Sequence, residues 1–257
     1  MENKQSFGFN EDSHDIRDVT FGGANVPSKI LREDGQWTPP QFEKQSYGSF
    51  DTQGCISFGT NNVLEMLHHV QFGYEPNYSD RFLVVNSGTT RGGNTPRKVY
   101  SALRKQGTVL EEDYPFPDYT KEDYYKEVPS NLLTQGKKWA STHSFSYAKV
   151  GTNPNNLKHA LQFSPLGLGL YAWAKNSEGL YYQPNGVRAN HFCVLIGYEE
   201  GKHWLVFDTY EESVKKLVYD YPFNYVCGYT LTKKKPYPSL SQNIWKDLFS
   251  YFKFKRA

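Results

Sequence analysis

Cys55 follows a short run of turn residues, Asp51 to Gly54, and begins an apolar stretch whose spacing predicts a helix. A thiol in the first turn of a helix lies near unpaired backbone amides and the positive end of the helix dipole, which favour the thiolate. A thiolate is a nucleophile that needs only modest assistance. Asp51 and Thr52 are expected to cap this helix. The alternative interpretation is a small, buried and unreactive cysteine.

A nucleophilic thiol needs a base, and His191 is the best candidate among the seven histidines. It begins the apolar run at 191–198, and a second run begins at His203 and ends at Asp208. Two antiparallel strands joined by a tight turn bring the start of the first beside the end of the second. Asp208 can then hold one imidazole nitrogen and leave the other for a thiol. His203 lies nearer the turn and is expected at the surface.

Two parts of different character must position these residues. Helical spacing dominates the first half, with a buried helix after Cys55 and a second helix over residues 95–107. Short runs rich in β-branched and aromatic residues follow from Leu166 onward, separated by turns. Helices followed by consecutive strands predict an α+β fold.

The composition excludes several classes of protein. Lys and Arg number 29 against 27 Asp and Glu, and a net charge of +2 does not indicate a nucleic-acid binder. Aromatic residues make up 16% of the chain, enough to build a core. No stretch approaches the ~18 apolar residues of a membrane span, and the N-terminus lacks the apolar part of a signal peptide. Three cysteines indicate neither a disulfide framework nor a four-cysteine zinc site, so we expect no metal and no cofactor.

Four segments between residues 37 and 210 resemble, in the same order, motifs of the papain-like cysteine peptidases. The nucleophile segment reads QGCISFG, and the histidine segment reads NHFCVLIGYEEGKHWLVFDTY. Between them lies RGGNTPRKVYSALRKQGTVLEEDYPF, and QWTPPQFEKQ lies upstream. No single fragment is decisive, but the ordered set identifies the family.

The resemblance implies a fold of two lobes with a cleft between them. Cys55 would begin the central helix of a helical lobe at about 37–150, and His191 and Asp208 would lie on a strand-rich lobe at about 151–238. Cys55 would be the nucleophile and His191 its acid and base. Asp208 stands where the family usually has Asn.

The resemblance also implies residues that bind the substrate. Gly92 and Gly93 would form a backbone edge on which an extended peptide lies by strand addition. Tyr210 stands where a Trp normally covers the catalytic pair.

The segment before Cys55 departs from the family pattern. The Gln that stabilises the oxyanion normally stands six residues before the nucleophile, where this chain has Ser49. Gln45 ends the run that carries the Gln in the family, with four extra residues before Cys55, whereas Gln53 is only two residues away. We favour Gln45, because the side chain of Gln53, only two residues before the start of the helix, has little reach toward the oxyanion. The disulfides of secreted members are missing, and with about 50 residues before Cys55 no autoinhibitory propeptide is visible.

The predicted function is thiol-dependent hydrolysis of peptide bonds, with a peptide or protein as substrate. One alternative is a cell-wall or isopeptide amidase with the same triad. Another is a structural protein that retains the fold without turnover. Selective labelling of Cys55 by a thiol reagent would favour an enzyme.

The two ends of the chain lie outside the predicted catalytic domain at 37–238. Residues 1–36 are polar and rich in turns and form an arm with little to bury against its own body. Residues 239–257 place apolar side chains on one face of a helix. We expect both ends to contact protein partners in a larger assembly such as a virus or phage particle, with a cytoplasmic or virion-associated location.

Overall fold

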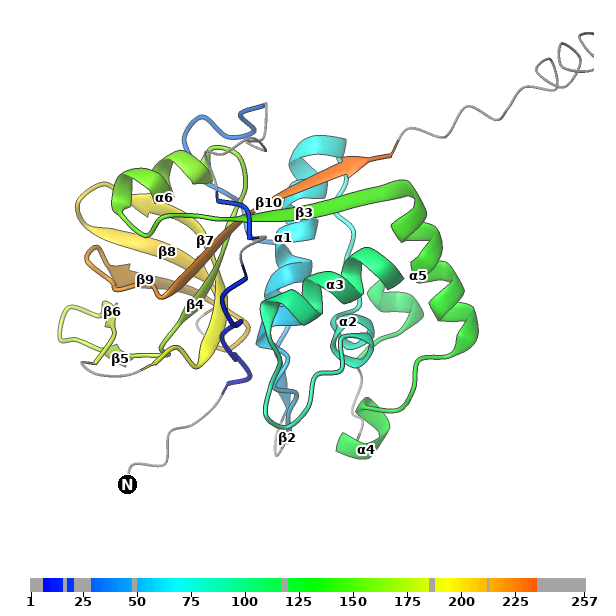
Figure 1. Cartoon of the computed structure of the whole chain (residues 1–257). Coiled ribbons are helices and arrows are strands. Elements are labelled where there is room, and N and C mark those ends of the chain that lie inside the picture. Colours follow the sequence, from blue (N-terminus) through cyan, green and yellow to red (C-terminus); the bar gives the residue numbers. More distant parts are fainter. Residues whose placement is uncertain are drawn as a thin grey trace, which may run out of the picture.

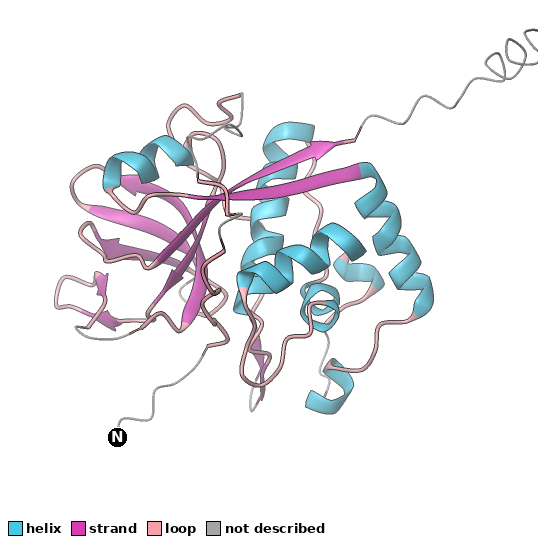
Figure 2. Cartoon of the chain, viewed as in Figure 1, coloured by secondary structure: helices cyan, strands magenta, loops and turns pink. Residues whose placement is uncertain are grey.

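The computed structural model describes residues 7–15, 18–20, 29–47, 50–116, 120–184, 188–211 and 213–234. The helix expected at 239–257 lies outside these residues. Figures 1 and 2 show two lobes, one of helices and one built on a sheet, with residues 7–15 of the arm running between them. This arrangement confirms the α+β prediction.

The helical lobe surrounds one long buried helix, α1. Its elements are the hairpin β1 (Ser46–Tyr47) and β2 (Phe50–Asp51), the helices α1 (Cys55–Phe72), α2 (Asp80–Asn86), α3 (Pro96–Gln106), α4 (Lys121–Tyr124) and α5 (Ser130–Thr142), and a 3-10 turn at Glu111–Asp113. Pro96 occupies the first turn of α3, where its missing N–H costs no hydrogen bond.

The second lobe is an eight-stranded sheet in the order β3-β10-β4-β7-β8-β9-β6-β5. Its strands are β3 (His143–Lys149), β4 (Leu166–Leu170), β5 (Ala174–Lys175), β6 (Tyr181–Tyr182), β7 (His191–Glu199), β8 (His203–Phe207), β9 (Val214–Val218) and β10 (Tyr225–Lys233). Helix α6 (Pro154–Leu161) packs beside this sheet. Strand β3 precedes the lobe boundary expected near residue 150, yet it pairs with β10 within the sheet.

The two lobes meet where α1 packs on β7. Gly59 makes this close approach possible, because a Cβ atom there would lie 2.7 Å from the ring of Phe192. Buried apolar side chains of α1 and β7 belong to the same core cluster. The contact places the first turn of α1 beside the start of β7, where the backbone amide of Phe192, the residue after His191, reaches the Cys55 thiol.

Two local expectations were wrong. Gly54, without a side chain, is the residue that precedes α1, while Asp51 and Thr52 accept hydrogen bonds from the backbone amides of Gln53 and Gly54. These bonds shape a turn in which Gln53 takes a positive φ of 52°. His203 is buried rather than at the surface, because β8 lies inside the sheet between β7 and β9.

Candidate active site

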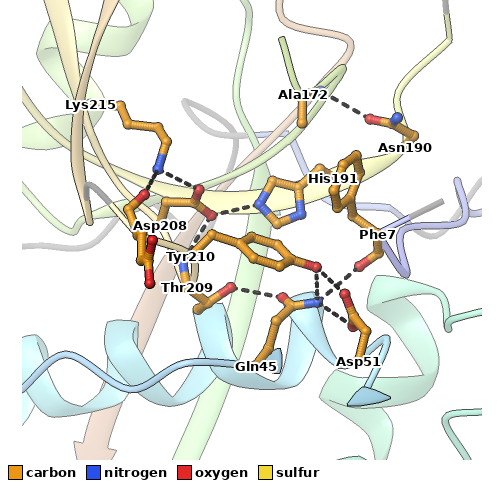
Figure 3. A network of polar contacts seen from close by, with 11 residues as sticks. Phe7, Gln45, Asp51, Ala172, Asn190, His191, Asp208, Thr209, Tyr210 and Lys215 are labelled. Carbon is orange, nitrogen blue, oxygen red and sulfur yellow. Dashed lines mark hydrogen bonds and ion pairs between the residues drawn. The ribbon is translucent and has the colours of Figure 1, made fainter. Parts of the chain in front are cut away.

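His191 and Asp208 come together at the end of the β7–β8 pair. His191 is the first residue of β7, and Asp208 directly follows β8. His191 Nε2 lies 2.6 Å from Asp208 Oδ1, and the two side chains are 0% and 1% exposed (Figure 3). The backbone amide of Thr209 donates to the same oxygen at 2.8 Å. A carboxylate in this position fixes the tautomer and orientation of the imidazole.

The other oxygen of Asp208 faces a buried lysine. Lys215 Nζ of β9 lies 2.9 Å from Asp208 Oδ2 and also donates to the carbonyl of Glu211 at 2.7 Å. Burial alone raises the pKa of Asp208, but the charges and hydrogen bonds of His191 and Lys215 outweigh it and hold that pKa below its usual value. Asp208 is therefore a carboxylate with a cationic partner on one oxygen and the imidazole on the other.

Cys55 is the first residue of α1 and is 0% exposed. Burial raises the pKa of its thiol well above the usual value, the amides of Phe192 and Ile56 lower it, and the carboxylates of Asp51 and Asp208 raise it. The thiol of Cys55 is therefore neutral in this structure. His191 Nδ1 is buried and makes no hydrogen bond to the described residues, so it is available as the proton acceptor.

Gln45 directs its amide group into the site. The hairpin β1–β2 contains the extra residues between Gln45 and Cys55 and folds the chain back, so that Thr52 N donates to Gln45 O at 3.0 Å. Gln45 Oε1 accepts from Thr209 Oγ1, while Nε2 faces three acceptors: the Tyr210 hydroxyl at 2.7 Å, Asp51 Oδ1 at 3.1 Å and the Phe7 carbonyl at 3.3 Å. A carbonyl oxygen already held by this amide is a good stand-in for an oxyanion. The structure describes no such contact for the Gln53 side chain.

Tyr210 covers the imidazole. Its ring centroid lies 5.4 Å from that of His191 at an angle of 55°. Its hydroxyl donates to Asp51 Oδ2 and accepts from Gln45 Nε2 at 2.7 Å. Tyr210 thus packs against the imidazole with its ring and holds the Gln45 amide with its hydroxyl (Figure 3).

The backbone edge at Gly92 and Gly93 is occupied by the chain's own arm. Gly93 has a φ of 80°, and a Cβ atom there would lie 2.1 Å from Gly8 O, so only glycine permits this approach. Asn94 N donates to Gly8 O, and Asn10 N donates to Asn94 O, both at 2.9 Å. Asn10 Nδ2 donates to the Gly92 carbonyl at 2.6 Å.

Two phenylalanines anchor the arm in the cleft. The Phe7 ring lies 5.5 Å from both His191 and Tyr210, and it covers the imidazole. Phe9 is 4% exposed, with its ring stacked 6.3 Å from Phe192 and edge-on to Tyr225 at 5.9 Å. The arm therefore buries apolar surface against its own body, contrary to our expectation, because the alternation Phe7-Gly8-Phe9 directs both rings into the cleft.

Charged contacts hold the next part of the arm on α3. The Asp12 carboxylate accepts from the backbone amide of Arg97 at 3.0 Å, in the first turn of that helix. The Arg97 guanidinium pairs with Asp15 at 3.7 Å and Asp18 at 3.2 Å. The arm thus bridges both lobes, since Phe7 N also donates to the carbonyl of Asn190 at 3.1 Å.

The described residues also bear on a metal site, a membrane span and the two other cysteines. Within the described ranges, His, Cys, Asp and Glu do not gather into a group of three or more that could hold a metal ion. Among the same residues, no helix has the length and apolar character of a membrane span. Cys193 and Cys227 are buried free thiols, like Cys55.

Contributors missed from the sequence include Phe7, Phe9, Asp51, Thr209 and Lys215. Lys215 left a weak signal, because it lies two residues before Leu217 and shares the buried face of β9. Phe9 alternates with Phe7 in an otherwise polar segment.

Comparisons with known proteins identify the family of this chain. The papain family of cysteine proteases matches residues 46–221. A putative cathepsin L 3 of Paramecium tetraurelia is 23% identical over 202 residues, covering 75% of this chain and 60% of its own length. Macrodontain-1 of Ananas macrodontes is 22% identical over 167 residues, covering 62% of this chain and 74% of its own.

Solved structures share the fold. Xylellain, a cysteine protease from Xylella fastidiosa, aligns with a TM-score of 0.68 at 17% identity, covering 91% of this chain and 97% of its own. The cysteine protease and lectin-like domains of Cwp84, a surface-layer-associated protein of Clostridium difficile, align with a TM-score of 0.65 at 16% identity, covering 91% of this chain and 57% of their own. The match over residues 46–221 places this chain in the papain family of cysteine proteases.

Proposed function

We propose that the protein hydrolyses peptide bonds with Cys55 as nucleophile, His191 as acid and base, and Asp208 as the residue that orients the imidazole. The contact of 2.6 Å between His191 and Asp208 carries this proposal. It occupies Nε2 and leaves the buried Nδ1 free of hydrogen bonds within the described part of the chain. α1 and β7 pack together, and the Cys55 thiol at the start of the helix meets the backbone amide of Phe192, the residue after His191.

The reaction follows from these positions. His191 Nδ1 accepts the proton of the Cys55 thiol as the sulfur attacks the substrate carbonyl carbon. Gln45 Nε2 and the backbone amide of Cys55 donate to the oxygen that becomes negative. His191 then returns the proton to the leaving amine. A water molecule, deprotonated by the same imidazole, hydrolyses the thioester and releases Cys55.

The occupied cleft supports two further statements about substrate and resting state. The arm blocks access to Cys55, so the enzyme rests in a closed form and a substrate must displace residues 7–10. The buried ring of Phe9 indicates that the pocket beside Phe192 and Tyr225 accepts an aromatic side chain of the substrate. The expected role of the arm in a larger assembly has no support in its described part, which packs on the catalytic domain.

Cleavage of a peptide library by the full chain tests the function. Cys55→Ala and His191→Ala should each abolish cleavage, because a nucleophile and its base act as one unit. Cys193→Ala and Cys227→Ala, which also remove a buried thiol, are the matched controls and should retain activity. Turnover by the Cys55→Ala protein at the normal rate would refute the proposal.

A further inference from the structure

Lys215 occupies an unusual position for a lysine. It is 5% exposed on the buried face of β9, where Leu217 also points inward. Its ammonium group lies 5.5 Å from the ring centroid of Trp173 and 5.8 Å from that of Tyr181. Burying a lysine costs free energy unless its charge is paired. The carboxylate of Asp208, 2.9 Å away, provides that pairing (Figure 3).

The carboxylate of Asp208 divides its two oxygens between two tasks. Oδ1 receives the imidazole of His191 and the backbone amide of Thr209. Oδ2 receives the ammonium group of Lys215, which is itself held by the Glu211 carbonyl. With both oxygens engaged, the plane of the carboxylate cannot rotate without breaking an ion pair. Lys215 therefore fixes the oxygen that orients His191.

The balance of charges in the site also points to a role for Lys215. A thiolate and an imidazolium together are neutral, and the amide usual at the position of Asp208 in this family adds no charge. The carboxylate of Asp208 adds a buried negative charge beside the pair. Such a charge stabilises the imidazolium but opposes the thiolate. The cation of Lys215 cancels it, so that Asp208 and Lys215 together act as a neutral hydrogen-bond acceptor.

We propose that Lys215 is a positioning residue for the catalytic pair, which holds Asp208 in its orienting rotamer and cancels its charge. This inference rests on the hydrolysis proposed above. In this role Lys215 acts through Asp208 rather than on the substrate or the reacting atoms. Among the residues that the structure describes, the other titratable groups near Asp208 or Lys215 are Cys55, His191, Cys193, Tyr181 and Tyr210, with Asp51 beyond Cys55.

The test compares four variants of the full chain: Lys215→Met, Asp208→Asn, the double variant, and Lys215→Arg. Lys216→Met is the control, because Lys216 is the adjacent residue of the same strand but is exposed. The dependence of kcat/KM on pH is measured for each. We expect Lys215→Met to lower the maximum by about 10-fold, the lower range for loss of a residue that orients a functional ligand.

The pH profile separates positioning from simple stability. Lys215→Met leaves an uncompensated carboxylate, so the thiolate forms, and the imidazolium is lost, only at higher pH. Both limbs of the profile then move upward by about one to two pH units, the effect of one charge within about 8 Å at an effective dielectric constant of about 20. Asp208→Asn leaves an uncompensated ammonium group and moves both limbs downward. The double variant returns toward the original profile, and Lys215→Arg retains it.

Nitrogen NMR of the His191 imidazole, assigned with His191→Gln, gives a readout that needs no turnover. In Lys215→Met the charged imidazolium should persist to higher pH than in the wild-type chain. Unchanged limbs and an unchanged imidazole titration, with only a lower unfolding midpoint, would overturn the role of Lys215. Normal cleavage by Cys55→Ala would instead overturn the hydrolytic mechanism, while the imidazole titration still tests the pairing of Lys215 with Asp208.

Discussion

Replacing Phe9 by Ala should release the arm from the cleft and increase the reactivity of Cys55. The ring of Phe9 is buried between Phe192 and Tyr225, and a Cβ atom on Gly169 would lie 2.4 Å from its tip. Full burial of a phenylalanine stabilises by about 1.5–3 kcal/mol. Since about 1.4 kcal/mol corresponds to a factor of ten, losing the ring should raise the population with a detached arm by roughly 10-fold to 150-fold.

The rate constant for alkylation of Cys55 by iodoacetamide measures this population directly, because the closed thiol is buried and neutral. It should rise by the same factor until the open form predominates, and kcat/KM for peptides should rise with it. Val19→Ala is the matched control, since it shortens an exposed side chain on the same arm. An alkylation rate equal to that of the wild-type chain would refute the reasoning. Urea unfolding shows whether the domain itself remains folded.

Three other changes probe the site and its surroundings. Gln45→Ala should lower kcat by about 100-fold or more with little change in KM, as for one lost oxyanion donor, whereas Gln53→Ala should do much less; the reverse ranking would show that we have assigned the wrong glutamine. Gly169→Val should fill the pocket of Phe9 and reduce cleavage of peptides with an aromatic side chain there more than of those with a small one, a selectivity that library profiling measures; an unchanged profile would exclude this pocket as a subsite. Burial raises the pKa of Glu111 from 4.5 to about 7, so its carboxyl favours the folded state at low pH and this stabilisation is lost as the pH rises from about 4.5 to about 7. Glu111→Gln should therefore reduce the fall in the free energy of unfolding between pH 5 and pH 8 by up to about 3 kcal/mol, measured with urea; an equal fall in both proteins would contradict this.

The sequence predicted the elements whose signals are local. The helix beginning at Cys55 and the strands beginning at His191 and His203 follow from periodicity and turn residues within short windows. The pairing of two consecutive strands then brings His191 and Asp208 together, because a tight turn determines which residues lie opposite each other. The catalytic roles of these residues stay predictions until variants are measured.

Contacts between distant segments could not be predicted in the same way. Lys215 meets Asp208 only because β9 pairs with β8, and in the sequence it is one of two adjacent lysines in VKKLV. The arm reaches the cleft from a segment in which Phe7 and Phe9 are separated only by Gly8, too short for a periodic signal. The hairpin β1–β2 explains the unusual spacing between Gln45 and Cys55. The extra residues form a folded insertion, which need not move the residue that precedes it.

The junction between α5 and β3 has a mechanical consequence. α5 ends at Thr142 and β3 begins at His143, so the chain enters the sheet without a linker residue, and all seven residues of β3 pair with β10. A hinge needs residues that are free to change their backbone angles, and this crossing provides none. The width of the cleft therefore stays constant, and the arm leaves the cleft by breaking its backbone hydrogen bonds one after another. A force applied to the N-terminus should thus detach the arm in an early step at low load, well before the sheet ruptures.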